Sequence, residues 1–205
     1  DKGEFKAGSE DSLFRALALR TLELPVKEML RQGLERDLPD DPGVITALRS
    51  NMSDEDKHDR ALGYVVDAHG TVDKYEREAE NIRKAWLRDP SHPILKTAIL
   101  ERSVFFVLLP YFRFNGDMGI RSVAADISRD EQTHVAIHAM CAHDINEFTT
   151  PALNRLRRAT VAWVMDGLSS NTDDKYLDKD FWLKSSDSLY TQGKAPGLAD
   201  TQRAR

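Results

Sequence analysis

The sequence contains two copies of the pattern Asp-Glu-x-x-His, and each copy lies inside a stretch with helical periodicity. The first copy spans Asp54–His58 and the second spans Asp130–His134. A Glu and a His three residues apart lie on one face of a helix, so both side chains can reach a single metal ion. One copy can arise by chance in an acid-rich helix. Two copies, each about 13 residues after a helix start, indicate a repeated metal-binding unit.

Each Glu-x-x-His pair is preceded by a further Glu on the helix before it, at a matching depth. Glu101 and Glu131 each lie 13 residues from the turn that joins their helices, which places both about 20 Å from the same hairpin end. Glu23 precedes Glu55 by 32 residues, against 30 residues from Glu101 to Glu131. Glu101 also lies in a long apolar stretch, where a carboxylate needs a charge partner or a metal ion. The spacing therefore predicts that the four carboxylates converge.

Helical periodicity runs through most of the chain, and no period-2 alternation bounded by turn residues is present, so we expect an all-α fold. The predicted helices are Leu13–Leu34, Pro42–His69, Thr71–Arg88, Ile94–Phe114, Met118–His143 and Pro151–Leu168. Pro25 should kink the first helix or limit one of its ends, and Gly70 should stop the second. A turn over Arg36–Asp41 connects these two helices.

The four helices that carry the candidate ligands are predicted to form a four-helix bundle with a di-metal site in its core. Thr71–Arg88 is the long crossover and Pro151–Leu168 is an extra C-terminal helix. The bundle domain is expected over 1–168. Residues 169–205 are rich in Asp, Lys, Ser and Gly, which predicts an extended C-terminal tail. We expect its one apolar cluster to pack on the bundle, through Tyr176, Phe181, Trp182 and Leu183.

The candidate metal ligands are Glu23, Glu55, His58, Glu101, Glu131 and His134. Four carboxylates balance the charge of two divalent cations, and a mixture of oxygen and imidazole donors suits iron or manganese. Zinc would prefer fewer ligands, commonly with sulfur, and calcium would not take the histidines. We expect two iron ions, while Mn/Fe and Mn/Mn pairs stay open because their ligand preferences overlap. His138, one turn after His134, is a candidate for a group that contacts a ligand.

The order Glu, Glu-x-x-His, Glu, Glu-x-x-His resembles the ferritin-like di-iron carboxylate superfamily. The local sequence is most similar to the small subunit of class I ribonucleotide reductase. The likeness covers about Leu13–His143 and is most specific over Glu101–His134, which ends in the pattern I-x-R-D-E-x-x-H. It implies a ferritin-like four-helix bundle. It also implies that Glu101 and Asp130 take part in the chemistry, with Asp130 hydrogen-bonded to the metal ligand His58.

The same resemblance implies an apolar pocket beside the metals, lined by Phe105, Leu109, Leu62 and Ile127. Leu62 occupies the position at which the family has its radical-bearing tyrosine, and Tyr64 lies on a different side of the helix. The chain also has no tryptophan before Trp86, whereas the family uses an earlier tryptophan to carry electrons. We therefore expect a site like that of the family without the usual tyrosyl radical.

Three functions are compatible with this pattern. The first is a di-iron oxidoreductase that activates O2 and takes electrons or a hydrogen atom from a partner or an apolar substrate. The second is a ferritin-like ferroxidase that assembles into a cage and stores iron. The third is a metal-free structural bundle that keeps the carboxylates as a buried network. Particle size separates the first two, since an oxidase should be a monomer or a homodimer, and metal content separates the third.

Charge and composition exclude two classes of partner. Acidic and basic residues are interleaved and the net charge is -5, so no broad basic surface for nucleic acid is predicted. The longest apolar stretch, Val104–Phe112, contains Pro110 and is far shorter than the roughly 20 residues that span a bilayer. The single cysteine, Cys141, fits a reducing compartment, and we expect a cytoplasmic protein.

Overall fold

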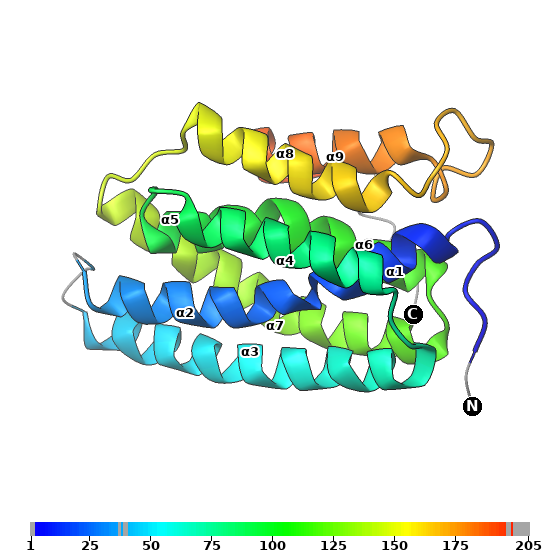
Figure 1. Cartoon of the computed structure of the whole chain (residues 1–205). Helices are drawn as coiled ribbons and strands as arrows, with labels where there is room; N and C mark the ends of the chain where they lie inside the picture. The colour runs from blue at the N-terminus through cyan, green and yellow to red at the C-terminus, as the bar shows by residue number, and fades with distance from the viewer. Residues whose placement is uncertain (1–2, 37, 39–40, 196–197, 199–205) are drawn as a thin grey trace.

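The computed structural model describes residues 3–36, 38, 41–195 and 198, and these residues form packed helices with no β-strand among them (Figure 1). The all-α class is confirmed. The helices are α1 (Glu10–Ala18), α2 (Glu23–Leu34), α3 (Pro42–His69), α4 (Asp73–Arg88), α5 (Pro93–Leu100), α6 (Phe106–Asn115), α7 (Met118–Asp144), α8 (Pro151–Met165) and α9 (Lys179–Gln192). A 3₁₀ turn, Leu19–Leu22, joins α1 to α2, and a π-helical turn, Glu101–Phe105, joins α5 to α6.

Four rods of helix form a ring around the core. Helix α2 packs on α3, α3 packs on α7, α7 packs on both α5 and α6, and α5 packs back on α2. Because α5, the π turn and α6 follow one another without a break, they act as one rod. Helix α4 covers α1 and the 3₁₀ turn, and α8 and α9 lie together on the side away from α3 (Figure 1). A helical bundle is therefore the architecture, with α4, α8 and α9 outside its ring.

The ends of α3 form as the sequence predicts. The Asp41 side chain accepts a hydrogen bond from the Gly43 N–H at 2.7 Å, and Pro42 occupies the first helical position, where its missing N–H costs nothing. Gly70 follows the helix with φ 86°, a conformation that residues with a Cβ rarely adopt. The predicted bounds of this helix are confirmed.

The first predicted helix is interrupted. Leu13–Leu34 was predicted as one helix that Pro25 kinks or limits, and the chain instead forms α1, the 3₁₀ turn and α2. Pro25 is the third residue of α2, in the first turn, where its N–H has no helical acceptor to lose. The prediction that Pro25 limits one end is confirmed, and the break places Glu23 at the first position of α2.

The extended tail predicted from residue 169 is wrong for Lys179–Gln192, which forms α9. Asp178 caps this helix by accepting from the Asp180 N–H at 2.9 Å, and Gly193 ends it with φ 69°. The high content of Asp, Ser and Lys concealed these helix signals. The packing of the apolar cluster on the bundle is confirmed, because Trp182 is fully buried and meets Tyr111 of α6 edge-on at 5.2 Å.

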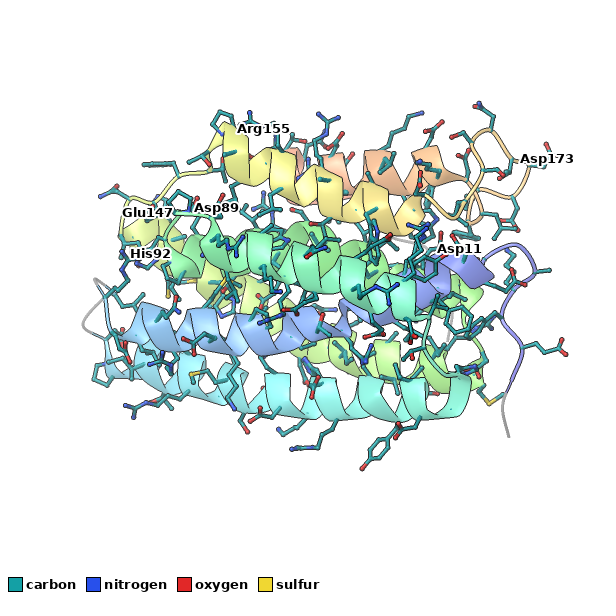
Figure 2. All side chains as sticks on the ribbon, viewed as in Figure 1. Asp11, Asp89, His92, Glu147, Arg155 and Asp173 are labelled. Carbon is teal, nitrogen blue, oxygen red and sulfur yellow. The ribbon has the colours of Figure 1, made fainter. Side chains whose placement is uncertain are left out.

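Parts of two predicted segments, 37 and 39–40 in the turn before α3 and 196–197 and 199–205 in the tail, lie outside the described residues. Charged side chains such as Arg155 on α8 and Asp173 in the loop before α9 project outward (Figure 2). None of the described helices has both the length and the apolar character needed to cross a bilayer.

Replacing Trp182 by Ala should lower the free energy of unfolding by about 3–5 kcal/mol, because it removes the largest buried side chain of α9. Phe148→Ala is the control, since that ring is 72% exposed and its loss should change stability by less than about 0.5 kcal/mol. Urea unfolding of both variants measures the difference. Equal stability of the two variants would contradict the docking of α9.

Candidate metal centre

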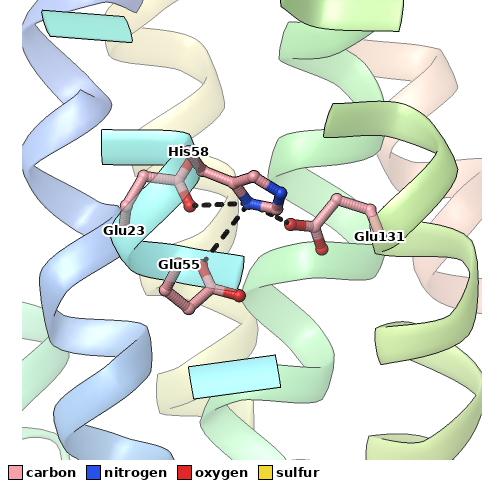
Figure 3. Close-up of side chains that lie close together, drawn as sticks. All are labelled: Glu23, Glu55, His58 and Glu131. Atoms are coloured by element: carbon pink, nitrogen blue, oxygen red, sulfur yellow. Dashed lines mark ion pairs between the residues drawn. The ribbon is translucent and has the colours of Figure 1, made fainter. Parts of the chain in front are cut away.

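All six predicted ligands meet in the middle of the ring. Glu23 begins α2, Glu55 and His58 lie on α3, Glu101 begins the π turn, and Glu131 and His134 lie on α7. Each of these side chains is buried, with Glu23 the most exposed at 4%. Figure 3 shows three carboxylates from three helices converging on one imidazole nitrogen. The structure therefore brings the candidate ligands together, as their matching depths along the two hairpins predicted.

The six residues form two clusters that share two carboxylates. We call Glu23, Glu55, His58 and Glu131 the His58 cluster, and Glu55, Glu101, Glu131 and His134 the His134 cluster. In each cluster the ligand-type atoms all lie within 4.8 Å of one another. Atoms bound to one ion at about 2.1 Å are separated by no more than about 4.2 Å, so a small contraction would bring each set into coordination distance.

Glu55 and Glu131 each divide their two oxygens between the clusters. The Oε2 atom of Glu55 lies 3.9 Å from His58 Nδ1, and its Oε1 atom lies 3.3 Å from His134 Nδ1. The Oε1 atom of Glu131 lies 3.3 Å from His58 Nδ1, and its Oε2 atom lies 3.6 Å from His134 Nδ1. Two carboxylates with this orientation are placed to bridge two ions.

Eight buried polar atoms of the six ligands lack hydrogen-bond partners among the described residues. The atoms are Glu23 Oε2, both carboxylate oxygens of Glu55 and Glu131, Glu101 Oε1, and the Nδ1 atoms of His58 and His134. Buried polar atoms are normally paired, and a buried charge costs several kcal/mol unless something neutralises it. Every one of the six candidate ligands contributes such an atom, so this donor set fits a pair of cations.

The two histidines present Nδ1 to the centre because an Asp holds the other nitrogen. Asp130 Oδ2 lies 3.2 Å from His58 Nε2, and Asp54 Oδ2 lies 3.4 Å from His134 Nε2. A proton on Nε2 donated to carboxylate leaves the Nδ1 lone pair free for a metal. The contact of Asp130 with His58 agrees with the prediction. The matching role of Asp54 was not predicted, although its position in the repeated motif carried the signal.

His138 contacts a predicted ligand, as its position one turn after His134 suggested. Its Nδ1 atom lies 2.6 Å from Glu101 Oε2, and its Nε2 atom lies 3.1 Å from Asn51 Nδ2. Burial and the neighbouring His134 lower the pKa of His138 to about 3, so the ring is neutral and its Nδ1 can donate a proton to Glu101. Asn51 was missed, since an amide four residues before Glu55 has no distinctive sequence signal.

Buried apolar side chains lie about one helical turn from three of the candidate ligands. Leu62, Phe105, Leu109 and Ile127 are each at most 5% exposed. Tyr64, by contrast, is 74% exposed on the outer side of α3, in agreement with its predicted orientation. Position 62 is thus occupied by a buried hydrocarbon side chain.

Burial sets the protonation of the metal-free centre. It raises the pKa of Glu101 and of Glu23 well above the usual value, and the neighbouring carboxylates raise both further. Burial lowers the pKa of His134, but the carboxylates of Glu131 and Glu55 outweigh it and the pKa rises to about 10. Protons therefore neutralise the centre when cations do not.

Comparison of the chain with protein-family models, with curated proteins and with solved structures finds no match. The residues and their geometry are therefore the whole basis for the function proposed below.

Replacing Glu101 by Gln should remove about one metal ion of the expected two per chain, because this side chain belongs to the His134 cluster alone. Elemental analysis of protein produced with iron and manganese measures this. Glu35→Gln is the matched control, since its side chain is 63% exposed and pairs only with Arg31 in the described contacts. Unchanged metal content in the Glu101 variant would defeat its assignment as a ligand.

The metal-free protein should lose stability as the pH rises from 7 to 9. His134 has a pKa of about 10 in the folded chain and about 6.5 when unfolded, so its stabilising contribution is complete below pH 6.5 and is lost toward pH 10. The raised pKa values of Glu23 and Glu101 act in the same direction. The lowered pKa values of Glu131 and His138 alter stability only below about pH 6.5.

Urea unfolding with a chelator at both pH values measures this fall. With Mn(II) bound the fall should be smaller, because the ion takes the place of the protons. Equal or greater stability at pH 9 in the chelator would contradict the described electrostatics.

Proposed function

We propose that this chain is a ferritin-like di-iron carboxylate oxidoreductase, similar to the small subunit of class I ribonucleotide reductase, that activates O2 at the bundle core. The observation that carries the proposal is the sharing of Glu55 and Glu131 between two ligand clusters, with one oxygen of each carboxylate facing each cluster. Glu55 and Glu131 would each contribute one oxygen to each of two ions, and two ions held in this way could act together on one small molecule.

Iron is the first choice of metal on chemical grounds. Hard carboxylate oxygens with one imidazole per cluster suit Fe(II), and the same donors would accept Mn/Fe or Mn/Mn pairs. When bound, such ions supply the electrons that O2 takes up. The buried Cys141 fits a cytoplasmic location, where Fe(II) is available.

The protein's own contribution is to fix the ligands and exclude water. Asp130 and Asp54 orient the two imidazoles, and His138 donates to Glu101. The six ligand side chains are at most 4% exposed, which limits the access of water to them. These contacts preserve the donor atoms in position before any ion arrives, which limits the rearrangement that binding requires.

The differences from the ribonucleotide reductase pattern indicate which kind of electron donor the site would use. With Leu62 in place of the radical-bearing tyrosine, oxidising power does not rest on a tyrosine at that position. We therefore propose that electrons, or a hydrogen atom, come from a separate donor, either a protein partner or an apolar substrate.

Addition of O2 to the anaerobic Fe(II) protein should produce an absorption change that saturates at about two iron ions per chain, with matching O2 uptake. Glu131→Gln should abolish most of this change, because that carboxylate belongs to both clusters. Stopped-flow absorption and an oxygen electrode make the two measurements.

Three other outcomes would point elsewhere. Protein that binds no iron would favour the metal-free structural bundle. Very large particles that accumulate many iron ions per chain would favour iron storage. Iron that binds at two per chain without reacting with O2 would contradict the oxidoreductase while leaving the metal site in place.

A further inference from the structure

Helix α9 is hydrogen-bonded to the π turn that carries Glu101. Each of the two elements donates to a backbone carbonyl of the other. The Ser186 hydroxyl of α9 donates to the Ser103 carbonyl oxygen at 2.7 Å. Arg102 of the π turn donates from Nε to the Leu189 carbonyl at 3.0 Å and from Nη2 to the Tyr190 carbonyl at 2.6 Å. The two carbonyls lie in the last turn of α9, where the Leu189 carbonyl also accepts from the Gly193 N–H at 3.0 Å.

Ser186 is itself held from the other side by a buried arginine of α8. Arg157 is 1% exposed, and its Nη1 donates to Ser186 Oγ at 2.6 Å. Its other nitrogens donate to Asn154 Oδ1 and Asp187 Oδ1. Because the hydroxyl oxygen accepts from a cation, its own proton is directed to Ser103 and the bond is strengthened.

The π turn sets the orientation of Glu101 relative to α6. The Phe106 N–H bonds to the Glu101 carbonyl five residues back, so the turn holds one residue more than an α-helix would. Since each helical residue rotates the chain by about 100°, a return to α-helical register would rotate Glu101 relative to α6 by about that angle. The bond from Ser186 to the Ser103 carbonyl ties the turn to α9, which opposes such a rotation.

The interaction uses the backbone of Ser103 and not its side chain. The Ser103 hydroxyl is buried and has no hydrogen-bond partner among the described residues. Ser185, the neighbour of Ser186, bonds only to its own helix in the described contacts, through the Phe181 carbonyl at 2.8 Å. These two serines provide matched controls.

We propose that Ser186, oriented by Arg157, is a positioning residue that holds the π turn and so fixes the Glu101 carboxylate in the His134 cluster. The inference rests on the proposed metal pair. It assigns to the α8–α9 layer a role in the metal centre, exerted through one backbone carbonyl. The expected consequence is selective, because Glu101 belongs to one cluster and the His58 cluster contains no residue of the π turn.

The test is titration of metal-free protein with Co(II), followed by visible absorption, in Ser186→Ala and in the controls Ser185→Ala and Ser103→Ala. Glu101→Gln identifies which of the two binding steps belongs to the His134 cluster. Ser186→Ala should weaken that step about tenfold and leave the other unchanged, as loss of a supporting hydrogen bond does at metal sites. Both controls should titrate like the unsubstituted protein.

Hydrogen exchange of the metal-free protein gives a readout that needs no metal. Amides of Glu101–Phe105 should exchange faster in Ser186→Ala than in Ser185→Ala, with the rest of the bundle unchanged. Equal weakening of both Co(II) steps, no weakening, or the same effect in Ser185→Ala would overturn the inference and leave the metal pair standing. Absence of Co(II) binding in the unsubstituted protein would instead overturn the proposed function and this inference together.

Discussion

Four carboxylates are buried together in the core, and most of their oxygens have no hydrogen-bond partner among the described residues. The rest of the structure depends on how this group is neutralised. An unpaired buried charge costs several kcal/mol, and a whole domain is stable by only about 5–15 kcal/mol. Such a group persists only if protons or cations neutralise it. The four carboxylates come from four different rods of the ring, so the neutralising ions would also join those rods to one another.

The two Asp-Glu-x-x-His motifs support each other across the α3–α7 contact. The Asp of each motif holds the imidazole of the other, through the pairs Asp130–His58 and Asp54–His134. Each motif therefore supplies a shared carboxylate, a nitrogen ligand and the group that orients its partner's nitrogen ligand. This reciprocity explains why the Asp occurs in both copies, since a lone Glu-x-x-His pair would leave the second imidazole nitrogen without a designated acceptor.

The site was more predictable than its surroundings because charged residues in apolar helices leave few alternatives. Glu101 lies within a run of aliphatic and aromatic residues, where a carboxylate needs a charge partner or a metal ion. The hairpin spacing placed it at the same depth as Glu131. Helix α9 was missed because its composition resembles a tail, and its stability comes from burying Trp182 against α6. The π turn and the contact of Asn51 with His138 depend on the exact register between helices, which hydrophobic periodicity does not specify.

The buried side chains near the ligands bear on how the proposed oxidoreductase would use its oxidising power. Leu62, Phe105 and Ile127 are not readily oxidised, and the exposed Tyr64 lies on the outer side of α3. A tyrosine at position 62 would retain an oxidising equivalent inside the protein as a radical, whereas leucine forms no persistent radical. These hydrocarbon side chains therefore favour transfer of the oxidising equivalents to an external donor over their storage in the protein.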